Sequence, residues 1–170
     1  STVEGRSMML NDVDSSYVDG VNMRLDNIND STINATDLFI SDAHGSTIDG
    51  HNIAGSFVLN SDIHGHYSSI DFLSRVRADL NRSMVAHALD SSIYLDQSLA
   101  TYVATSSVHS VDSLVQYVDY SDVNVHQAVL RHGTSIFGSI HQSSVIHGSN
   151  LDLNLEQSML THVNHADISG

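Results

Sequence analysis

The chain has 170 residues and a mass of 18.4 kDa, with 41% hydrophobic residues, 15% charged residues and a net charge of -14. It contains no Cys, Pro, Trp or Lys. The absence of Cys excludes a disulfide scaffold, a thiolate metal site and a Cys nucleophile. No stretch approaches the 18 or so consecutive apolar residues of a membrane-spanning helix, so we expect no membrane span.

Apolar residues recur at every fifth position over the first third of the chain. The series comprises Val3, Met8, Val13, Val18, Met23, Ile28, Ile33, Leu38, Ala43, Ile48, Ile53, Val58 and Ile63. A helix would space such residues by 3.6 and a strand by 2. A period of five therefore predicts a short strand followed by a corner, repeated many times. Gly, Asn and Asp between the apolar residues suit such corners, because they tolerate the left-handed conformation.

From residue 68 onward this series carries mainly small residues, and the large apolar residues lie two positions later. They are Ile70, Leu80, Val85, Leu95, Val115, Tyr120, Val125, Leu130, Ile140, Val145, Leu155 and Leu160. We interpret this as a two-residue register slip near residues 64–70, with the first phase restored in the last two pentads. The alternative is an unbroken register in which the second series points outward as an apolar stripe. The expected core contains both series without Ala43 and Tyr120, and it also contains Ile168.

Several pentads place a small residue, then Asp or Asn, then an apolar residue. The closest are ADLNR at 78–82 and ADISG at 166–170, followed by SDIHG at 61–65. In this the sequence resembles the pentapeptide-repeat family over its whole length. The resemblance implies an all-β fold, a right-handed parallel β-helix (solenoid) with four pentads, or about 20 residues, in each coil. Residues 1–170 would then form a single solenoid domain without a separate capping domain.

The coil length can be tested against the charges. Coils of 20 residues would stack Glu4 on Arg24 and Asp62 on Arg82, and would give a rod roughly 40 Å long. A spacing of 15 also brings opposite charges together, at Asp62 and Arg77 and at residues 75 and 90. The charges therefore leave a four-sided and a three-sided coil both open.

Neither end of the chain carries an atypical repeat or an amphipathic helix that would cover a strand edge. A chain that stacks end to end, a fragment of a longer protein and an engineered repeat scaffold would each explain this. Our first hypothesis is a non-enzymatic structural rod whose partner is a second copy of itself, through end-to-end or edge-strand association. Such a rod needs no cofactor.

The acidic surface supports an alternative hypothesis. Eighteen Asp and two Glu face six Arg, and only Arg75, Arg77 and Arg82 come near to forming a basic patch. Direct nucleic-acid binding is therefore not expected. Some members of the pentapeptide-repeat family mimic DNA and bind type II topoisomerases, and the resemblance implies DNA gyrase as the alternative partner. Turn chemistry and solubility are the simpler explanation of so many Asp residues.

Twelve His residues invite a search for a metal site. His44, His64 and His66 would come within reach of one another if the coil held 20 residues, but no fourth ligand accompanies them. We interpret them as surface residues on turns, and predict no catalytic, cofactor or metal site. Columns spaced by 20, such as Thr2, Asn22 and Asp42, contain no regular row of one residue type.

Overall fold

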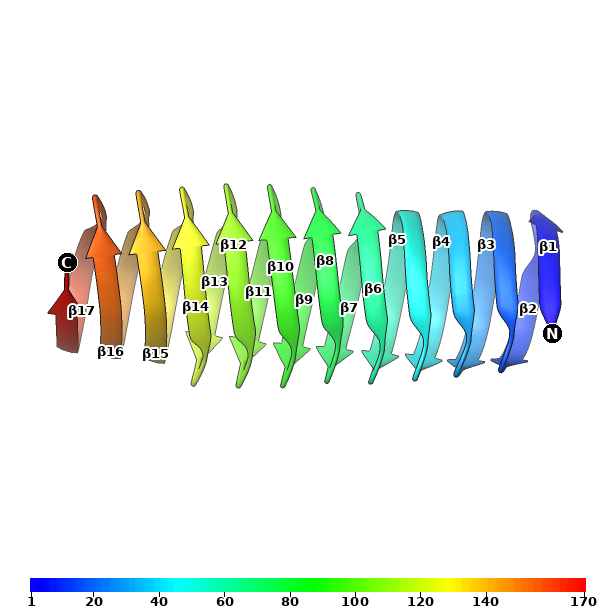
Figure 1. Cartoon of the computed structure of the whole chain (residues 1–170), viewed down its shortest axis with the longest axis horizontal. Coiled ribbons are helices and arrows are strands. Elements are labelled where there is room, and N and C mark those ends of the chain that lie inside the picture. The colour runs from blue at the N-terminus through cyan, green and yellow to red at the C-terminus, as the bar shows by residue number, and fades with distance from the viewer.

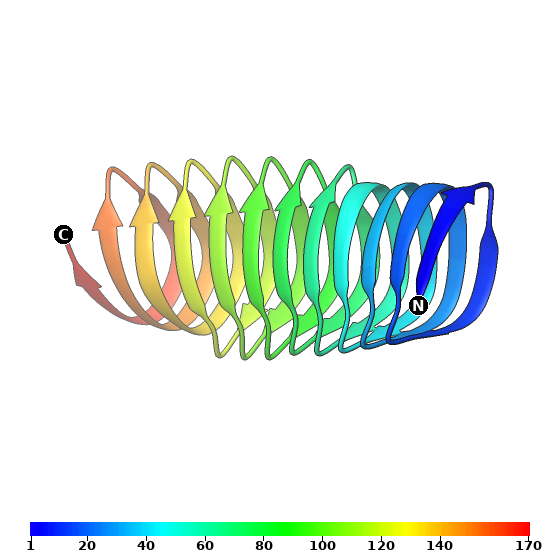
Figure 2. The ribbon, with the colours of Figure 1, turned by 45° about the vertical axis from the view of Figure 1, so that its right-hand side comes forward.

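The computed structural model of residues 1–170 is an all-β rod with the two termini at opposite ends (Figure 1). In Figure 1 the strands in front run upward and those behind run downward while the chain advances from right to left, which is a right-handed coil. Turning the rod by 45° shows the coils stacked one on the next along its whole length (Figure 2). The expected fold class, a parallel β-solenoid, is confirmed. The structure contains no helix that could cross a membrane.

Seventeen strands join in one parallel sheet. They are β1 (Thr2–Arg6), β2 (Met9–Asp14), β3 (Tyr17–Asn29), β4 (Thr32–His44), β5 (Thr47–Leu59), β6 (Asp62–His66), β7 (Ser69–Ser74), β8 (Arg77–Asn81), β9 (Met84–Leu89), β10 (Ser92–Asp96), β11 (Leu99–Ala104), β12 (Ser107–Val111), β13 (Leu114–Asp119), β14 (Asp122–His126), β15 (Val129–His141), β16 (Ser144–Glu156) and β17 (Met159–Ser169).

Each coil contains 15 residues, because strand partners keep that separation from one end of the rod to the other. Thr2 pairs with Tyr17 at the N-terminal end, and Asn154 pairs with Ser169 at the C-terminal end. The expectation of four pentads in each coil is therefore wrong, and three pentads complete a coil. About 11 coils at roughly 4.8 Å each give a rod roughly 50 Å long. We number the coil positions 1 to 15 from Ser1, so that strand partners share a position.

Two corners with left-handed backbone set this length. Position 7 has a positive φ in every coil, at Ser7, Asn22, Asp37, Asn52, Tyr67, Arg82, Gln97, Asp112, Gln127, Gln142 and Gln157. Position 15 does the same at Ser15, Asp30, Gly45, Asn60, Arg75, Asp90, Thr105, Tyr120, Ser135, Asn150 and His165. A left-handed residue other than Gly costs about 1–2 kcal/mol. Most of these corner residues are not Gly, so the neighbouring structure must hold them in place.

Serine hydroxyls directly after many of these corners provide that support. Ser46 donates a hydrogen bond from Oγ to the carbonyl of His44 (2.9 Å) and accepts one from the N–H of Ser31 in the preceding coil (3.2 Å). The same arrangement recurs at positions 1 and 8. The buried members are Ser31, Ser46, Ser61, Ser68, Ser83, Ser91, Ser98, Ser106, Ser113, Ser121 and Ser143. These hydroxyls pair backbone groups that the bend of the chain separates from the strand ladder.

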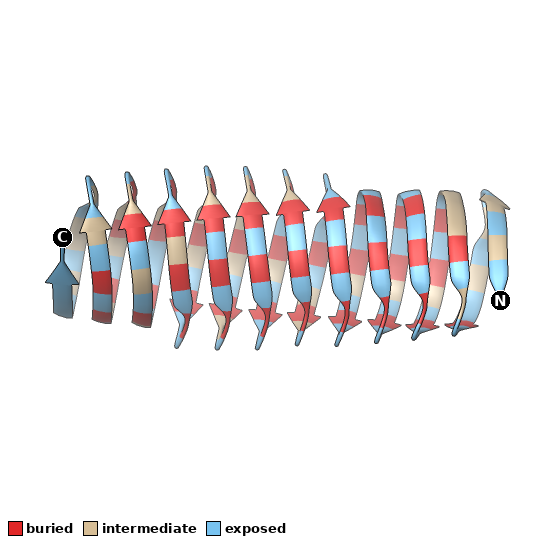
Figure 3. Cartoon of the chain, viewed as in Figure 1, coloured by how far each residue is buried: buried red, intermediate tan, exposed pale blue.

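Six positions of each coil, namely 1, 3, 5, 8, 10 and 13, point inward along the rod. Buried and exposed residues accordingly alternate along the strands (Figure 3). Both apolar series of the sequence occupy these inward positions. The first series falls at positions 3, 8 and 13, and the second falls at positions 5 and 10, apart from Tyr120 at position 15. The strand register is unbroken from β5 to β9. The predicted register slip is therefore wrong.

The alternative of an outward apolar stripe is wrong as well. Ile70, Leu80 and Val85 are each exposed by 1% or less. Tyr120 is the exception, since it occupies a left-handed corner and is 67% exposed. Arg75 and Asp90, which fall at the five-residue spacing of the second series but are charged, occupy the same corner position.

Most of the predicted core residues belong to one continuous cluster of packed side chains inside the rod. Nineteen are buried: Val13, Val18, Met23, Ile28, Ile33, Leu38, Ile48, Ile53, Val58, Ile63, Ile70, Leu80, Val85, Leu95, Val115, Val125, Leu130, Ile140 and Val145. Val3, Met8, Leu155 and Leu160 are partly buried against them. Ile168 is 49% exposed, contrary to expectation, because the last coil has a neighbour on one side only.

Candidate functional site

The outward positions form columns of side chains that run along the rod. In-register pairing places every fifteenth side chain directly beside its predecessor, about 4.8 Å away. The most continuous column is position 12, where rings occupy eight consecutive coils: Phe57, Phe72, His87, Tyr102, Tyr117, His132, His147 and His162. From His87 to His162 each ring stacks on the next, with centroids 4.8–5.2 Å apart. We call these eight residues the ring column.

A groove of about 420 Å³ follows the middle of the ring column. Its first wall is formed by rings from Phe72 to His132, and its second wall by position 14, at Leu89, Ala104, Asp119 and Thr134. Ala88, Val103 and Val118, which are buried at the position between the two walls, form its floor. No Arg lines the groove. Its volume lies within the range of about 300–1,000 Å³ that is typical of small-molecule sites.

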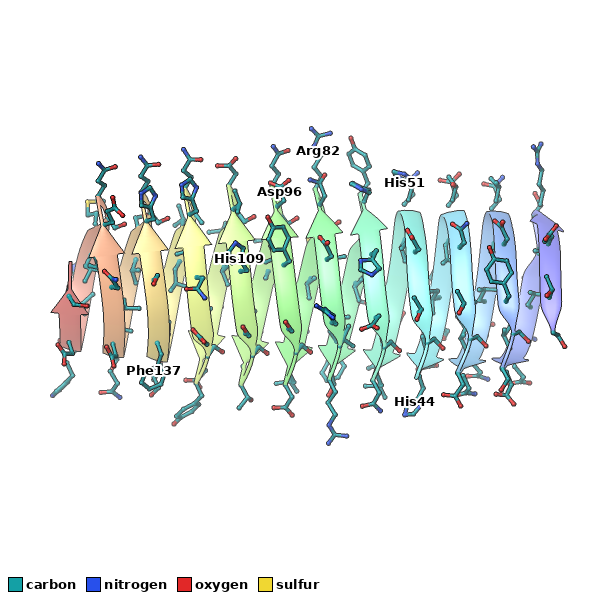
Figure 4. The ribbon with its side chains drawn as sticks, in the orientation of Figure 1. His44, His51, Arg82, Asp96, His109 and Phe137 are labelled. Atoms are coloured by element: carbon teal, nitrogen blue, oxygen red, sulfur yellow. The ribbon has the colours of Figure 1, made fainter.

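Several negative charges on the outer columns have a neutral, hydrogen-bonding Asn in the neighbouring coil. Asn27 donates to Asp12 (2.9 Å), Asn52 donates to Asp37 (2.7 Å), and Asn81 donates to the Asp96 carboxylate (2.6 Å). Arg82 and Asp96 project from the upper edge of the rod in Figure 4. Like charges in register are destabilising, so these Asn neighbours reduce repulsion within the stack. Carboxylates do lie in register at Glu4 and Asp19 and at Asp152 and Asp167.

The structure does not bring the three candidate His residues together. His44 lies at the lower edge in Figure 4, with Nε2 2.8 Å from the Asn60 amide nitrogen. His66 stacks on His51, which Figure 4 places at the upper edge. His64 pairs in register with Asp49 on one side and Asp79 on the other. No group of three or more His, Asp or Glu side chains has an arrangement that could hold a metal ion.

Sequence reasoning missed the ring column because it compared residues 20 apart. At a spacing of 15 the pattern is visible, since six consecutive members from His87 to His162 are His or Tyr. The Gln residues at 127, 142 and 157 and the serine positions repeat at the same spacing. Recurrence of residue type at 15 was therefore the available signal.

Comparison with known proteins yields similarity in structure alone, since no family model and no curated protein matches the sequence. One similar structure is HetL of the cyanobacterium Nostoc sp. strain PCC 7120, a pentapeptide repeat protein involved in heterocyst differentiation regulation. It is 12% identical, with a TM-score of 0.43, covering 98% of this chain and 86% of HetL.

Two further structures are similar at lower TM-scores. QnrB1, a plasmid-mediated fluoroquinolone resistance protein, is 11% identical with a TM-score of 0.38, and the match covers 98% of this chain and 92% of that one. A PL6 alginate lyase in complex with a trisaccharide is 7% identical with a TM-score of 0.36, and the match covers 96% of this chain and 54% of the lyase.

Proposed function

We propose that the chain is a non-enzymatic structural rod that associates end to end with further copies of itself. The observation that carries this proposal is the uniformity of the backbone ladder. Every inner coil is hydrogen-bonded to a coil on each side, whereas β1 and β2 at one end and β17 at the other have a coil on one side only. An edge of this kind is a template for a further strand. A second copy would extend the same ladder.

The side chains of the two ends are compatible in the register that continues the coil. In that register Arg6 of one copy lies on Glu156 of the next, Leu10 lies on Leu160, and Val13 lies on Val163. The first pair has opposite charges and the other two are apolar. Asp12 would lie on His162. The joint therefore places no two like charges on each other at these positions.

The chain length adds one requirement. The chain makes eleven complete coils and one pentad more, so residues 1–5 and 166–170 hold the same coil positions. One of these segments must detach for the coil to continue without a gap. Residues 166–170 are exposed throughout. Removing them should therefore strengthen the association.

A charged residue in the joint tests the proposal. Val163 is partly buried at the last coil and points inward, whereas the neighbouring Asn164 points outward. We expect Val163→Lys to weaken association at least about tenfold, and Asn164→Lys on the same strand to leave it nearly unchanged. Sedimentation across a range of concentrations, with electron microscopy of the rods, measures this. A wild-type chain that stays monomeric at high concentration refutes the proposal.

Exchange of charges tests the register of the joint. Arg6→Glu alone should weaken association because it puts two carboxylates together, and Glu156→Arg alone should do so by juxtaposing two guanidinium groups. The double variant restores an opposite pair and should recover the wild-type behaviour. Failure of the double variant to recover would show that the copies meet in another register.

The acidic DNA mimic is the weaker hypothesis. A net charge of -14 over roughly 50 Å is one charge per about 4 Å, against one per about 1.7 Å in duplex DNA. Because each coil is shorter, the chain forms more coils and a longer rod than expected, so the charge per unit length is lower. Competition with DNA for gyrase at low salt remains the test of that alternative.

A further inference from the structure

The groove beside the ring column has the shape and charge of a site for an elongated aromatic cation. We propose that it binds a planar aromatic cation about 15 Å long, lying parallel to the rod axis. Thioflavin T is a dye of this class. The proposal does not depend on end-to-end association, because the groove lies within a single chain, between β7 and β15.

The length of the ligand follows from the spacing of the rings. The centroids of His87, Tyr102, Tyr117 and His132 are separated by 5.2, 4.9 and 4.8 Å in succession. The four rings are nearly parallel, with interplanar angles of 4°, 11° and 13°. They make a straight wall about 15 Å long rather than a single pocket.

The planarity of the ligand follows from the parts of the rings that stacking leaves uncovered. The ring faces cover one another, so the edges and the outer sides remain for contact. Tyr102 is 49% exposed and Tyr117 is 41% exposed. A flat ligand laid lengthwise in the groove would cover these sides together with the floor at Val103 and Val118. It would thereby remove apolar surface from water on several coils at once.

The positive charge of the ligand follows from Asp119. It contributes the one carboxylate of the lining, it is exposed, and neither ion pair of the protein includes it. No Arg lies in the lining, and the whole chain carries -14. A cation would be attracted both by the Asp119 carboxylate and by the net negative charge of the chain, whereas an anion would be repelled.

A second depression on the rod provides a matched comparison. It has a similar volume of about 470 Å³ and also contains a stacked pair of rings, Tyr94 and His109, with centroids 5.0 Å apart. His109 is visible on the face toward the viewer in Figure 4. This depression is lined by Arg77 and Asp79 and has few apolar residues. It lacks the continuous wall, and its carboxylate shares the depression with the positive charge of Arg77, so we expect it not to bind.

The experiment is a fluorescence titration of thioflavin T with the full chain, in the fraction that elutes as a single rod. The expected result is a saturable rise in fluorescence with one dye per chain. The double variant Tyr102→Ala with Tyr117→Ala should bind at least about tenfold more weakly. Tyr94→Ala, which removes a ring of similar exposure from the other depression, should bind like the wild type. Equal losses in the two variants would overturn the proposal.

A blocking variant keeps all the rings in place. Ala104 lies on the second wall of the groove and points outward, so Ala104→Arg should fill the groove and oppose the cation without disturbing the core. We expect it to abolish binding while the melting temperature stays close to that of the wild type. Asp119→Asn should weaken binding several-fold. An Ala104→Arg variant that binds normally would place the dye elsewhere and refute the site.

Discussion

The first four coils and the middle coils fill the same cross-section with opposite choices of residue. In the first region position 5 is small and position 8 is large, as at Gly20 and Met23; in the middle region the sizes reverse, as at Leu80 and Ser83. Positions 5 and 8 flank one corner and touch each other. A Cβ added at Gly20 would lie 2.8 Å from Met23 Sδ. At most of these corners one of the two positions carries a bulky side chain, and the exceptions are Gly65 with Ser68 and Ser110 with Ser113.

The other corner shows the same exchange in most coils, although Ala43 with Ser46 and Ala88 with Ser91 are both small and Leu73 with Val76 are both large. Val118 is followed by the small Ser121, whereas Gly133 is followed three residues later by Ile136 and Gly148 by Leu151. A Cβ at Gly133 would collide with the Ile136 side chain. The apparent shift of phase in the sequence is therefore an exchange of size between neighbouring inward columns. The backbone register does not change.

The largest expected effect comes from removing bulk where the corner has only one large residue. Leu95 is completely buried and its corner partner is Ser98. Leu95→Ala should lower the free energy of unfolding by about 2–5 kcal/mol because a cavity remains. Thermal or urea unfolding measures the loss. Leu89→Ala, at a position 39% exposed, is the control and should cost less than about 1 kcal/mol.

A second prediction moves the bulky side chain from one position of the other corner to its partner position. Gly133→Val alone should cost about 1–3 kcal/mol, because it overpacks against Ile136. Combining it with Ile136→Ser recreates the pair found at Val118 and Ser121 and should cost less than the two single changes added together. A double-mutant cycle should give a favourable coupling of about 1–3 kcal/mol. Simple additivity would contradict the exchange of bulk between these two positions.

A third prediction concerns the serine hydroxyls that both regions share. Ser46→Ala removes the acceptor for the N–H of Ser31, which is buried. An unpaired buried donor costs about 1–3 kcal/mol, so a loss of that size is expected in urea unfolding. Ser69 is exposed and makes no side-chain hydrogen bond, which makes Ser69→Ala the matched control. If both variants were equally stable, the hydroxyls would not be supporting the corners.

The smallest effect should be a gain in stability. Ser110 is fully buried at position 5, its hydroxyl has no hydrogen-bond partner, and its corner partner Ser113 is also small. Ser110→Val supplies bulk and removes the unpaired hydroxyl, so it should stabilise the chain by about 1 kcal/mol. Calorimetry would measure a higher melting temperature. A lower one would mean that the added side chain overpacks this corner and would contradict the prediction.

The period of five made the β-solenoid and nineteen buried core residues predictable from sequence, because residues five apart, such as Val18, Met23 and Ile28, all point inward. The coil length was not predictable from that period, since 15 and 20 are both multiples of five. The value of 20 came from the family resemblance. The left-handed corners decide for 15, yet residues as different as Tyr67, Arg82 and Gln97 hold them. Backbone conformation at such residues is not evident from residue type.

The ring column and its groove depend on that same number. Tyr102 and Tyr117 are strand partners only in a coil of three pentads, and a coil of four pentads separates them. Side-chain columns therefore follow from the coil length and cannot be recognised before it is known. The proposed joint between copies depends on it as well, since Arg6 would meet Glu156 only in this register.

The coil length can be measured directly with engineered disulfides, since the chain has no Cys of its own. Asp62→Cys with Arg77→Cys places two thiols on strand partners in register, at a Cα separation that a disulfide can span, about 4.4–6.8 Å. Asp62→Cys with Arg82→Cys is the control at the spacing of four pentads. We predict that the first pair oxidises readily to an intramolecular disulfide and the second does not. Preferential oxidation of the second pair would contradict the coil of three pentads.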